Sequence, residues 1–274
     1  MAAIWSTPVR EHMSNKLVAV LPETPLSEVH AILEEHDISA VPIVDARGVL
    51  HGILSTKDLL REARIELLAP GEVARVTALP RTARDLMRTH VITVDEKAPL
   101  RAAAAKMVAH RIHRVVVMRG GVATGVFSTR DAMRALLAHR VATPLEQVMT
   151  KEVVTIDLGD TIRVAIGRLD DANVRGLVVV DGAWPIGVFT HLEALHARAL
   201  PATLLETKVE GVMSYETICL DVKTPLYRVA GHAIHMRVRR VLAVEKRRLR
   251  GIASGFDLVR VMLESAPTEL PMRA

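Results

Sequence analysis

Apolar residues follow two kinds of pattern along this chain, and each kind predicts one type of secondary structure. From Leu100 to Val108 the apolar positions are spaced i, i+3, i+4, i+7 and i+8, and Leu226 to Ile234 repeat that spacing. Such a spacing places the apolar side chains on one stripe of an amphipathic helix. The runs Val115 to Met118 and Val126 to Phe127 are instead continuously apolar, on either side of the Gly120-Gly121 turn. Continuous runs are typical of strands buried on both faces.

The same order of elements is predicted four times. Each copy begins with a short strand, at 18–20, 91–94, 153–156 and 218–220, and continues with a helix, two strands and a second helix. Proline stands at the start of the first helix in three copies, where its missing N–H costs little because the first turn leaves that group unpaired. The second helices are predicted to start near Lys57, Arg130, Leu192 and Phe256. The sequence therefore predicts an α/β fold made of four β-α-β-β-α copies.

A methionine and a glycine at nearly constant spacing mark the four copies. Each methionine is followed by its glycine 38 or 39 residues later, and a Ser or Thr stands three residues after each glycine. The pairs are Met13 and Gly52, Met87 and Gly125, Met149 and Gly187, and Met213 and Gly251. Only the first junction carries an insertion, which includes Ala69-Pro70-Gly71 and is typical of a linker. We expect repeats at 1–66, 82–140, 144–200 and 207–265, called the first to fourth segments below, and a linker at 67–81.

Composition narrows the class of protein. Half of the residues are hydrophobic and 24% are charged, which is typical of a globular chain. Aromatic residues make up only 3%, which argues against binding of single-stranded nucleic acid by base stacking. One cysteine excludes an internal disulfide, no apolar run approaches the ~20 residues of a membrane helix, and the first residues lack the pattern of a secretory signal. We therefore expect a cytoplasmic protein with no membrane partner.

The closing motif of each segment has a purely structural interpretation. Each Ser or Thr after the glycine is followed three residues later by Asp or Glu, ahead of an apolar helix, which is close to a capping box. Unpaired N–H groups at a helix start also attract anions. The same residues therefore suit a phosphate or a ribose, and the net charge of +5 fits an anionic partner. Spacing alone leaves both interpretations open.

The repeated segment resembles the cystathionine-beta-synthase (CBS) domain, from about Pro8 to about Glu264. The resemblance rests on the methionine opening, the order of elements, the stretch HDISAVPIVD (36–45) and the closing pattern G-h-h-[ST]-x-x-[DE]. It implies two tandem pairs of CBS repeats in a disc-like particle. It also implies a sensor of adenosine-containing ligands, an adenine nucleotide (AMP, ADP or ATP) or S-adenosylmethionine.

The resemblance further implies a role for each part of the motif. In CBS domains that bind nucleotides, such as the gamma subunit of AMP-activated kinase, the closing Asp accepts the ribose hydroxyls and the Ser or Thr approaches the first phosphate. A basic pair just before the second strand holds the phosphates. A carboxylate suits a cis-diol, and arginine forms strong charge-assisted bonds with phosphate.

Carrying this pattern onto the chain ranks the four segments. The second segment is complete and is our first choice; its residues are His113, Arg114, Ser128, Thr129, Arg130 and Asp131. The fourth has Arg239, Arg240, Ser254 and Asp257, with Phe256 in place of a polar residue. The first has Ser55, Lys57 and Asp58, but Ser39-Ala40 where the basic pair would stand. The third has Thr190 and the longer Glu193, and we expect no nucleotide there.

We therefore expect a regulatory, non-catalytic protein that binds an adenosine ligand and signals to a separate protein partner by a conformational change. This hypothesis allows either a monomer or a homodimer. The alternatives are a ligand-free module for assembly or dimerisation, a binder of S-adenosylmethionine, and a nucleic-acid binder that would use the basic stretch at 237–250. We interpret that stretch as a solvated turn, apart from the arginine pair at its start. His232 and His235 have no acidic or cysteine partner at ligand spacing, so we expect no metal site.

Overall fold

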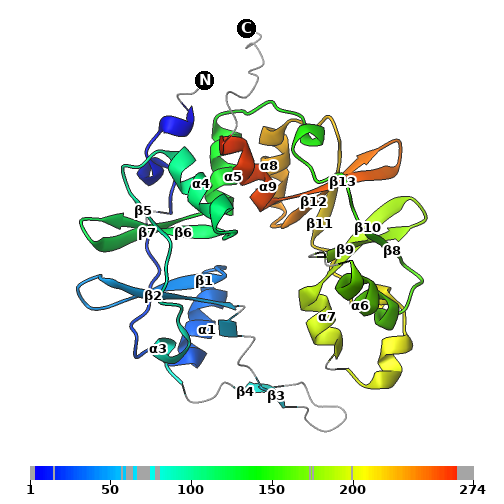
Figure 1. Cartoon of the computed structure of the whole chain (residues 1–274), viewed down its shortest axis with the longest axis horizontal. Coiled ribbons are helices and arrows are strands. Elements are labelled where there is room, and N and C mark those ends of the chain that lie inside the picture. Colours follow the sequence, from blue (N-terminus) through cyan, green and yellow to red (C-terminus); the bar gives the residue numbers. More distant parts are fainter. Residues whose placement is uncertain are drawn as a thin grey trace. The chain divides into compact units, whose positions relative to one another are not determined.

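The computed structural model describes residues 4–14, 16–56, 58–59, 64–66, 75–77, 81–172, 174, 176–198 and 200–263. These residues form two compact units. The N-terminal unit spans Trp5–Ser128, and the C-terminal unit contains Ile4 and the chain from Thr129 onward. Figure 1 labels the elements of both units.

The N-terminal unit contains the first segment from Trp5 onward and the second segment as far as the end of its last strand. Its elements are two 3-10 turns (Ile4–Ser6, which begins in the other unit, and Val9–Glu11), α1 (Leu26–Glu35), β1 (Ala40–Val44), β2 (Leu50–Ser55), β3 (Arg64–Glu66), β4 (Arg75–Thr77), α3 (Ala83–Leu86), β5 (Thr93–Asp95), α4 (Leu100–Ala109), β6 (Arg114–Arg119) and β7 (Val122–Ser128). Strand β5 runs parallel to β6, which pairs antiparallel with β7. Strands β1 and β2 are antiparallel, and β3 pairs with β4 at the predicted linker. Residues 67–74 and 78–80 of that linker lie outside the described residues.

The C-terminal unit repeats this arrangement twice. Its elements are α5 (Thr129–Ala138), β8 (Thr155–Asp157), α6 (Ile162–Asp171), β9 (Gly176–Asp181), β10 (Trp184–Thr190), α7 (His191–Arg198), β11 (Thr217–Asp221), α8 (Leu226–His235), β12 (Arg240–Glu245), β13 (Arg248–Ser254) and α9 (Gly255–Arg260), with 3-10 turns at Leu145–Gln147, Ala202–Glu206, Val209–Gly211 and Val261–Leu263. The sheets have the orders β8-β9-β10 and β11-β12-β13, each with one parallel and one antiparallel ladder. Helix α5 packs against α8 and α9. The predicted mixed α/β fold is confirmed.

The helices bury the stripes that the sequence predicts. In α4 the side chains of Leu100, Ala103, Ala104 and Met107 are fully buried, and α8 buries the same four positions. The prolines stand one residue before the first helical residue, with an extended backbone, rather than inside the first turn.

The strands differ from the predictions in two respects. The strand predicted at 18–20 is reduced to a single parallel bridge between Val20 and Ile43. In β7, buried Ala123, Gly125 and Phe127 alternate with more exposed residues, so the predicted burial on both faces is wrong for this strand. The central strand β6 of the same sheet does carry a continuous buried run.

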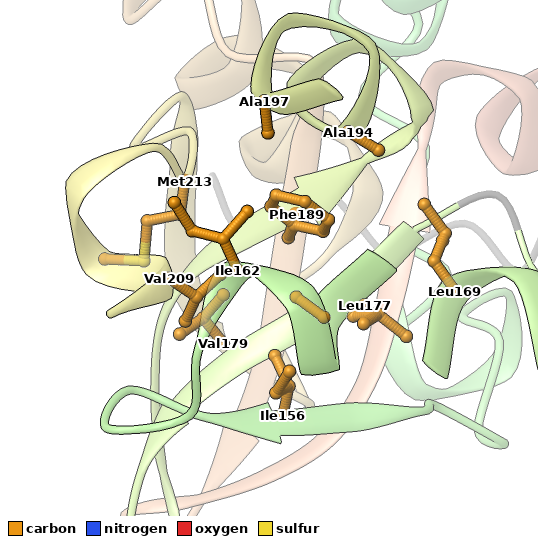
Figure 2. Packing of buried hydrophobic residues seen from close by; sticks show 11 residues of the cluster. Ile156, Ile162, Leu169, Leu177, Val179, Phe189, Ala194, Ala197, Val209 and Met213 are labelled. Atoms are coloured by element: carbon orange, nitrogen blue, oxygen red, sulfur yellow. The ribbon is translucent and has the colours of Figure 1, made fainter. Parts of the chain in front are cut away.

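Figure 2 shows the core of the third segment, which is built around Phe189 of β10. Ile162 comes from α6, and Ala194 and Ala197 come from α7. Met213 belongs to the opening of the fourth segment, yet it packs in this core of the third. The two segments therefore share part of their interior.

Each opening methionine packs against the glycine of the neighbouring segment and not against the glycine of its own. A Cβ atom on Gly251 would lie 2.6 Å from Sδ of Met149, and one on Gly187 would lie 3.1 Å from Sδ of Met213. In the N-terminal unit Gly52 faces Met87 and Gly125 faces Met13 in the same way. Such close approaches leave no room for a side chain at these glycines. We call this arrangement the methionine exchange.

The backbone follows the same exchange. The residue after each methionine forms an antiparallel bridge with the last strand of the neighbouring segment. The four bridges are Ser14–Val126, Arg88–Ile53, Thr150–Ile252 and Ser214–Val188. The N–H of Thr150 donates to the carbonyl of Ile252 at 2.8 Å, and the N–H of Ile252 donates back at 3.0 Å. Each pair of segments is thus joined by two reciprocal crossings.

The turn between β12 and β13 holds two residues in the left-handed region. Lys246 has φ 48° and Arg247 has φ 61°, whereas the turn between β6 and β7 uses Gly120 and Gly121 there. A residue other than glycine destabilises the fold by roughly 1–2 kcal/mol when it adopts the left-handed conformation. Glycine avoids that strain but loses more backbone entropy on folding, which offsets roughly 0.5–1 kcal/mol of the gain. We expect Arg247→Gly to stabilise the protein by about 0.5–1 kcal/mol in urea unfolding. Arg248→Gly, one residue later inside β13, is the control and should destabilise it; a loss of stability in Arg247→Gly would contradict the prediction.

Candidate functional site

The basic residue and the closing Ser face each other across the second and fourth sheets. Arg114 is the first residue of β6 and pairs with Ser128, the last residue of β7. Arg240 and Ser254 hold the same register in β12 and β13. Cβ atoms of directly opposite residues in an antiparallel pair lie about 4.5–5.5 Å apart. The structure therefore brings each of these predicted pairs together at one end of its ladder.

Arg114 extends from the second segment to the first. Its Nη2 donates to Oγ of Ser39 at 2.5 Å, and its Nη1 donates to the carbonyl of Ala40 at 3.3 Å. Ser39 and Ala40 occupy, in the first segment, the place of the basic pair. The half-buried guanidinium of Arg114 thus lies between the two segments, while His113, just before β6, is exposed.

The second closing motif continues from β7 directly into α5, at the boundary between the two units. Thr129 is the first residue of α5 and packs against α9, where a Cβ atom on Gly255 would lie 3.0 Å from Cβ of Thr129. Arg130 is exposed. Asp131 is 1% exposed, and its Oδ1 accepts a hydrogen bond from Nη1 of Arg134, one turn later, at 2.8 Å. A buried carboxylate therefore stands at this helix start.

The fourth closing motif forms a capping box. The N–H and Oγ of Ser254 donate to Oδ2 of Asp257 at 2.8 and 2.7 Å. Oδ1 of Asp257 has Nη1 of Arg260 at 3.6 Å, beyond hydrogen-bond distance. The structural interpretation of the motif is thus confirmed here, and it uses only one of the two carboxylate oxygens.

The basic pair of the fourth segment is divided between solvent and interior. Arg239 is exposed and Arg240 is half-buried. Burial lowers the pKa of Arg240, and the like charge of Arg239 acts in the same direction, while the carboxylates of Glu193 and Glu216 oppose both. Glu193 belongs to the third segment, so Arg240, like Arg114, lies close to its neighbouring segment.

The first closing motif is already engaged by an arginine. Ser55 ends β2, and its N–H donates to Oδ2 of the buried Asp58 at 3.1 Å; its hydroxyl contacts the same oxygen. Oδ1 of Asp58 accepts hydrogen bonds from Nε and Nη2 of Arg88 at 2.8 and 2.6 Å. Lys57 lies outside the described residues.

The charge state of Asp58 follows from these contacts. Burial alone would raise the pKa of Asp58, but the hydrogen bonds from Ser55 and Arg88 and the charge of Arg88 outweigh it, so the pKa lies below its ordinary value. A lowered pKa means that the pair stabilises the fold above the ordinary pKa of an aspartate. That stabilisation is lost as the pH falls through the lowered value.

The third closing motif also caps its helix. The N–H of Thr190 donates to Oε2 of Glu193 at 2.8 Å, and the Thr190 hydroxyl contacts the same oxygen. The opposite strand position is Gly176, so this ladder has no basic residue facing the hydroxyl. Arg175 lies outside the described residues.

The sequence motifs did not predict the three arginines that lie next to the closing aspartates. Arg134 and Arg260 follow their aspartates by three residues, and Arg61 follows Asp58 at the same spacing, so the spacing recurs in three segments and was visible in the sequence. Arg88 gave no repeated signal, because Ser14, Thr150 and Ser214 stand at the corresponding positions.

Two hollows of the C-terminal unit lie apart from the closing motifs. One, of about 490 Å³, lies on α6 around Gly167, and the other, of about 520 Å³, is lined by residues that include Glu146, Lys151 and Arg250. Within the described ranges, no group of three or more His, Cys, Asp or Glu side chains is placed to hold a metal ion. None of the helices in the described part of the chain is both long and apolar enough to cross a membrane.

Comparison with known proteins identifies the repeated fold. The family model "CBS domain" matches residues 9–64, 83–138 and 145–200. The fourth segment is not among the matched ranges, although it has the same element order. Protein MJ1404 of Methanocaldococcus jannaschii is 28% identical over 283 residues, which cover 96% of this chain; the chain spans 64% of the length of that relative.

Two solved structures share the fold over almost the whole chain. Protein MJ1225 of Methanocaldococcus jannaschii, described as a candidate archaeal homologue of g-AMPK, gives a TM-score of 0.70 at 18% identity, covering 93% of this chain and 99% of its own. A conserved protein of Pyrococcus horikoshii gives a TM-score of 0.65 at 20% identity, covering 93% of this chain and all of its own. At these identities the similarity concerns the fold.

Proposed function

This chain belongs to the CBS domain family, and from that premise we propose that it is a regulatory protein that senses an adenine nucleotide (AMP, ADP or ATP) and signals to a separate protein. The observation that carries the proposal is the pairing of a basic residue with the closing serine at one end of a ladder. Arg114 faces Ser128, and Arg240 faces Ser254. In both segments an aspartate follows the serine by three residues, on the first turn of the next helix.

The chemistry of these groups suits the two ends of a nucleotide. Arginine binds phosphate through charge-assisted hydrogen bonds, and a serine hydroxyl beside it adds a donor. A carboxylate accepts both hydroxyls of a ribose cis-diol. In the fourth segment, Oδ1 of Asp257 lies 3.6 Å from Nη1 of Arg260, which is beyond hydrogen-bond distance, so this oxygen is the proposed acceptor. The second segment remains our first choice because its motif is complete in the sequence, from the basic pair to the aspartate. A ribose there would replace the hydrogen bond that Oδ1 of Asp131 accepts from Arg134 on the same helix.

The contacts of Arg114 supply a route from binding to signalling. This arginine donates to Ser39 and Ala40 of the first segment. A phosphate that draws the guanidinium away loosens that connection, so ligand binding and the packing of the two segments are coupled. A ligand shifts such an equilibrium only by its difference in affinity for the two states.

A ligand-free assembly module, with dimerisation as its role, is the second candidate. The observation that favours it is that the closing motifs of the first, third and fourth segments satisfy their own serine or threonine groups. In that case the motifs would act as helix caps only. Sedimentation of the protein with and without AMP would show whether a homodimer forms and whether nucleotide changes it.

A small set of related ligands distinguishes these functions. We expect AMP and ATP to raise the thermal stability of the protein, because a ligand at 100 times its Kd adds about 2.7 kcal/mol. 2′-Deoxy-AMP should bind about 10- to 150-fold more weakly than AMP, since it lacks one hydroxyl for the charged carboxylate. Calorimetry with AMP, 2′-deoxy-AMP, adenosine, S-adenosylmethionine and a short RNA measures these differences. Binding of S-adenosylmethionine or RNA alone would overturn the nucleotide assignment, and binding of none would favour the assembly module.

A further inference from the structure

The ion pair between Arg88 and Asp58 joins two segments at a closing motif. Arg88 is the residue after the opening methionine of the second segment, and Asp58 closes the first. The carboxylate of Asp58 is 8% exposed, and the two nitrogens of Arg88 lie 2.6 and 2.8 Å from Oδ1. Oδ2 already accepts the N–H of Ser55. Both oxygens of Asp58 are therefore engaged within the protein.

The fourth segment provides a matched comparison. Asp257 uses Oδ2 for its serine in the same way, but its Oδ1 has Arg260 only at 3.6 Å. Arg260 lies one turn later on the same helix, whereas Arg88 reaches Asp58 from another segment. The two aspartates thus differ in the oxygen that is left for a ligand.

The methionine exchange explains why an arginine arrives at this place. The bridge between Arg88 and Ile53 lays the backbone of Arg88 along β2, just before Ser55, with the N–H of Arg88 2.9 Å from the carbonyl of Ile53. The bridge between Thr150 and Ile252 is its counterpart beside Ser254. The other segments place Ser14, Thr150 or Ser214 there. Those short side chains cannot form a two-nitrogen contact with a carboxylate.

We propose that Arg88 closes the ligand position of the first segment by occupying the carboxylate that would otherwise accept a ribose. The inference rests on the proposed function, because it assigns to Asp58 the role of ribose acceptor. A nucleotide can enter this position only by displacing a charge-assisted, two-nitrogen contact from a buried carboxylate. The first segment is thereby held silent by its own chain, whereas Oδ1 of Asp257 in the fourth segment has no arginine within hydrogen-bond distance among the contacts of the described residues.

Arg88→Ser tests the proposal, since serine is the residue that the first and fourth segments use at this position. Titration of AMP by calorimetry should show one more binding event per chain in Arg88→Ser than in the unaltered protein. Adding Asp58→Asn to Arg88→Ser should remove that event. Arg84→Ser is the matched control. It removes the same charge only four residues before Arg88, and Arg84 pairs with the exposed Glu23 rather than with a closing motif. Its number of binding events should be unchanged.

A second variant tests whether a change at position 88 simply misfolds the protein. Arg88→Lys cannot present two nitrogens to one oxygen, but it keeps a charge that still pairs with Asp58. It should therefore bind AMP in the first segment at least about tenfold more weakly than Arg88→Ser does. Circular dichroism of both variants reports whether the fold is kept.

The outcomes separate this inference from the proposed function. If the unaltered protein binds AMP and neither Arg88 variant gains an event, the closing role of Arg88 is wrong. If Arg88→Ser loses an event, Arg88 is a ligand contact and the proposal is again wrong. If neither the unaltered protein nor any variant binds AMP, the proposed nucleotide function fails first, and the inference fails with it.

Discussion

Arg114→Ala is expected to weaken the binding of AMP or ATP about 10- to 150-fold and to leave the affinity for adenosine almost unchanged. Arg114 stands opposite Ser128 and is assigned to the phosphate, so only ligands that carry a phosphate lose an interaction. In the unaltered protein a phosphate must draw Arg114 away from Ser39 and Ala40, whereas adenosine leaves those two hydrogen bonds in place. The ratio of the two affinities therefore measures the phosphate contact net of those two hydrogen bonds. Calorimetry with both ligands measures it.

The control for this experiment lies at the other end of the same strand. Arg119 ends β6 and faces Glu96 at 3.4 Å, so Arg119→Ala removes the same charge from the same element without touching the closing motif. Its AMP affinity should equal that of the unaltered protein. Equal AMP affinity in Arg114→Ala and the unaltered protein would refute the phosphate assignment and favour a ligand without phosphate, such as S-adenosylmethionine.

Gly251→Ala is expected to destabilise the C-terminal unit by about 1–3 kcal/mol, the usual cost of overpacking a tight interior. The new Cβ atom would lie 2.6 Å from Sδ of Met149 and 2.8 Å from the carbonyl oxygen of Thr150. The methionine side chain can turn away, but the backbone of Thr150 is held by its bridge to Ile252. Urea unfolding, followed by circular dichroism, measures the loss.

Gly167→Ala provides the contrast within the same unit. Gly167 lies on α6, and a Cβ atom there would meet nothing within 4 Å, so alanine should stabilise the helix by roughly 0.5–1 kcal/mol. In the double variant Met149→Ala/Gly251→Ala, the cost of the alanine at 251 should be smaller but not zero, because the contact with Thr150 remains. If Gly251→Ala unfolds at the same urea concentration as the unaltered protein, the methionine exchange does not limit the stability of this unit.

Sequence periodicity was sufficient for the elements but not for their connections. The spacing of apolar residues located α4 and α8, because a buried stripe leaves a direct trace in the sequence. The constant interval between methionine and glycine was equally visible. It could not show that Met149 contacts Gly251 rather than Gly187, since both glycines stand in the same context of their own segment. Contacts between segments depend on tertiary packing, and a regular repeat conceals which copy supplies the partner.

The candidate site was predictable to the extent that its residues recur. Ser254 and Asp257 form the capping box that their spacing indicates, and Arg240 stands opposite Ser254 as the alignment of the segments requires. The ion pair of Asp58 was not predictable, because Arg88 lies 30 residues away and has no counterpart in the other segments. Whether a nucleotide uses the second and fourth motifs stays a prediction.

The methionine exchange has a consequence for the protein while it is being synthesised. Met13 packs against Gly125, so this contact of the N-terminal unit cannot form until about 110 further residues have been translated. At roughly 5–20 residues per second, the opening of the chain remains unpaired for several seconds outside the ribosome. In the C-terminal unit Met149 waits in the same way for Gly251. A nascent chain that stalls after one repeat therefore exposes a glycine without its methionine and a strand edge without its bridge. Chaperones bind such exposed surfaces, and proteases cut them.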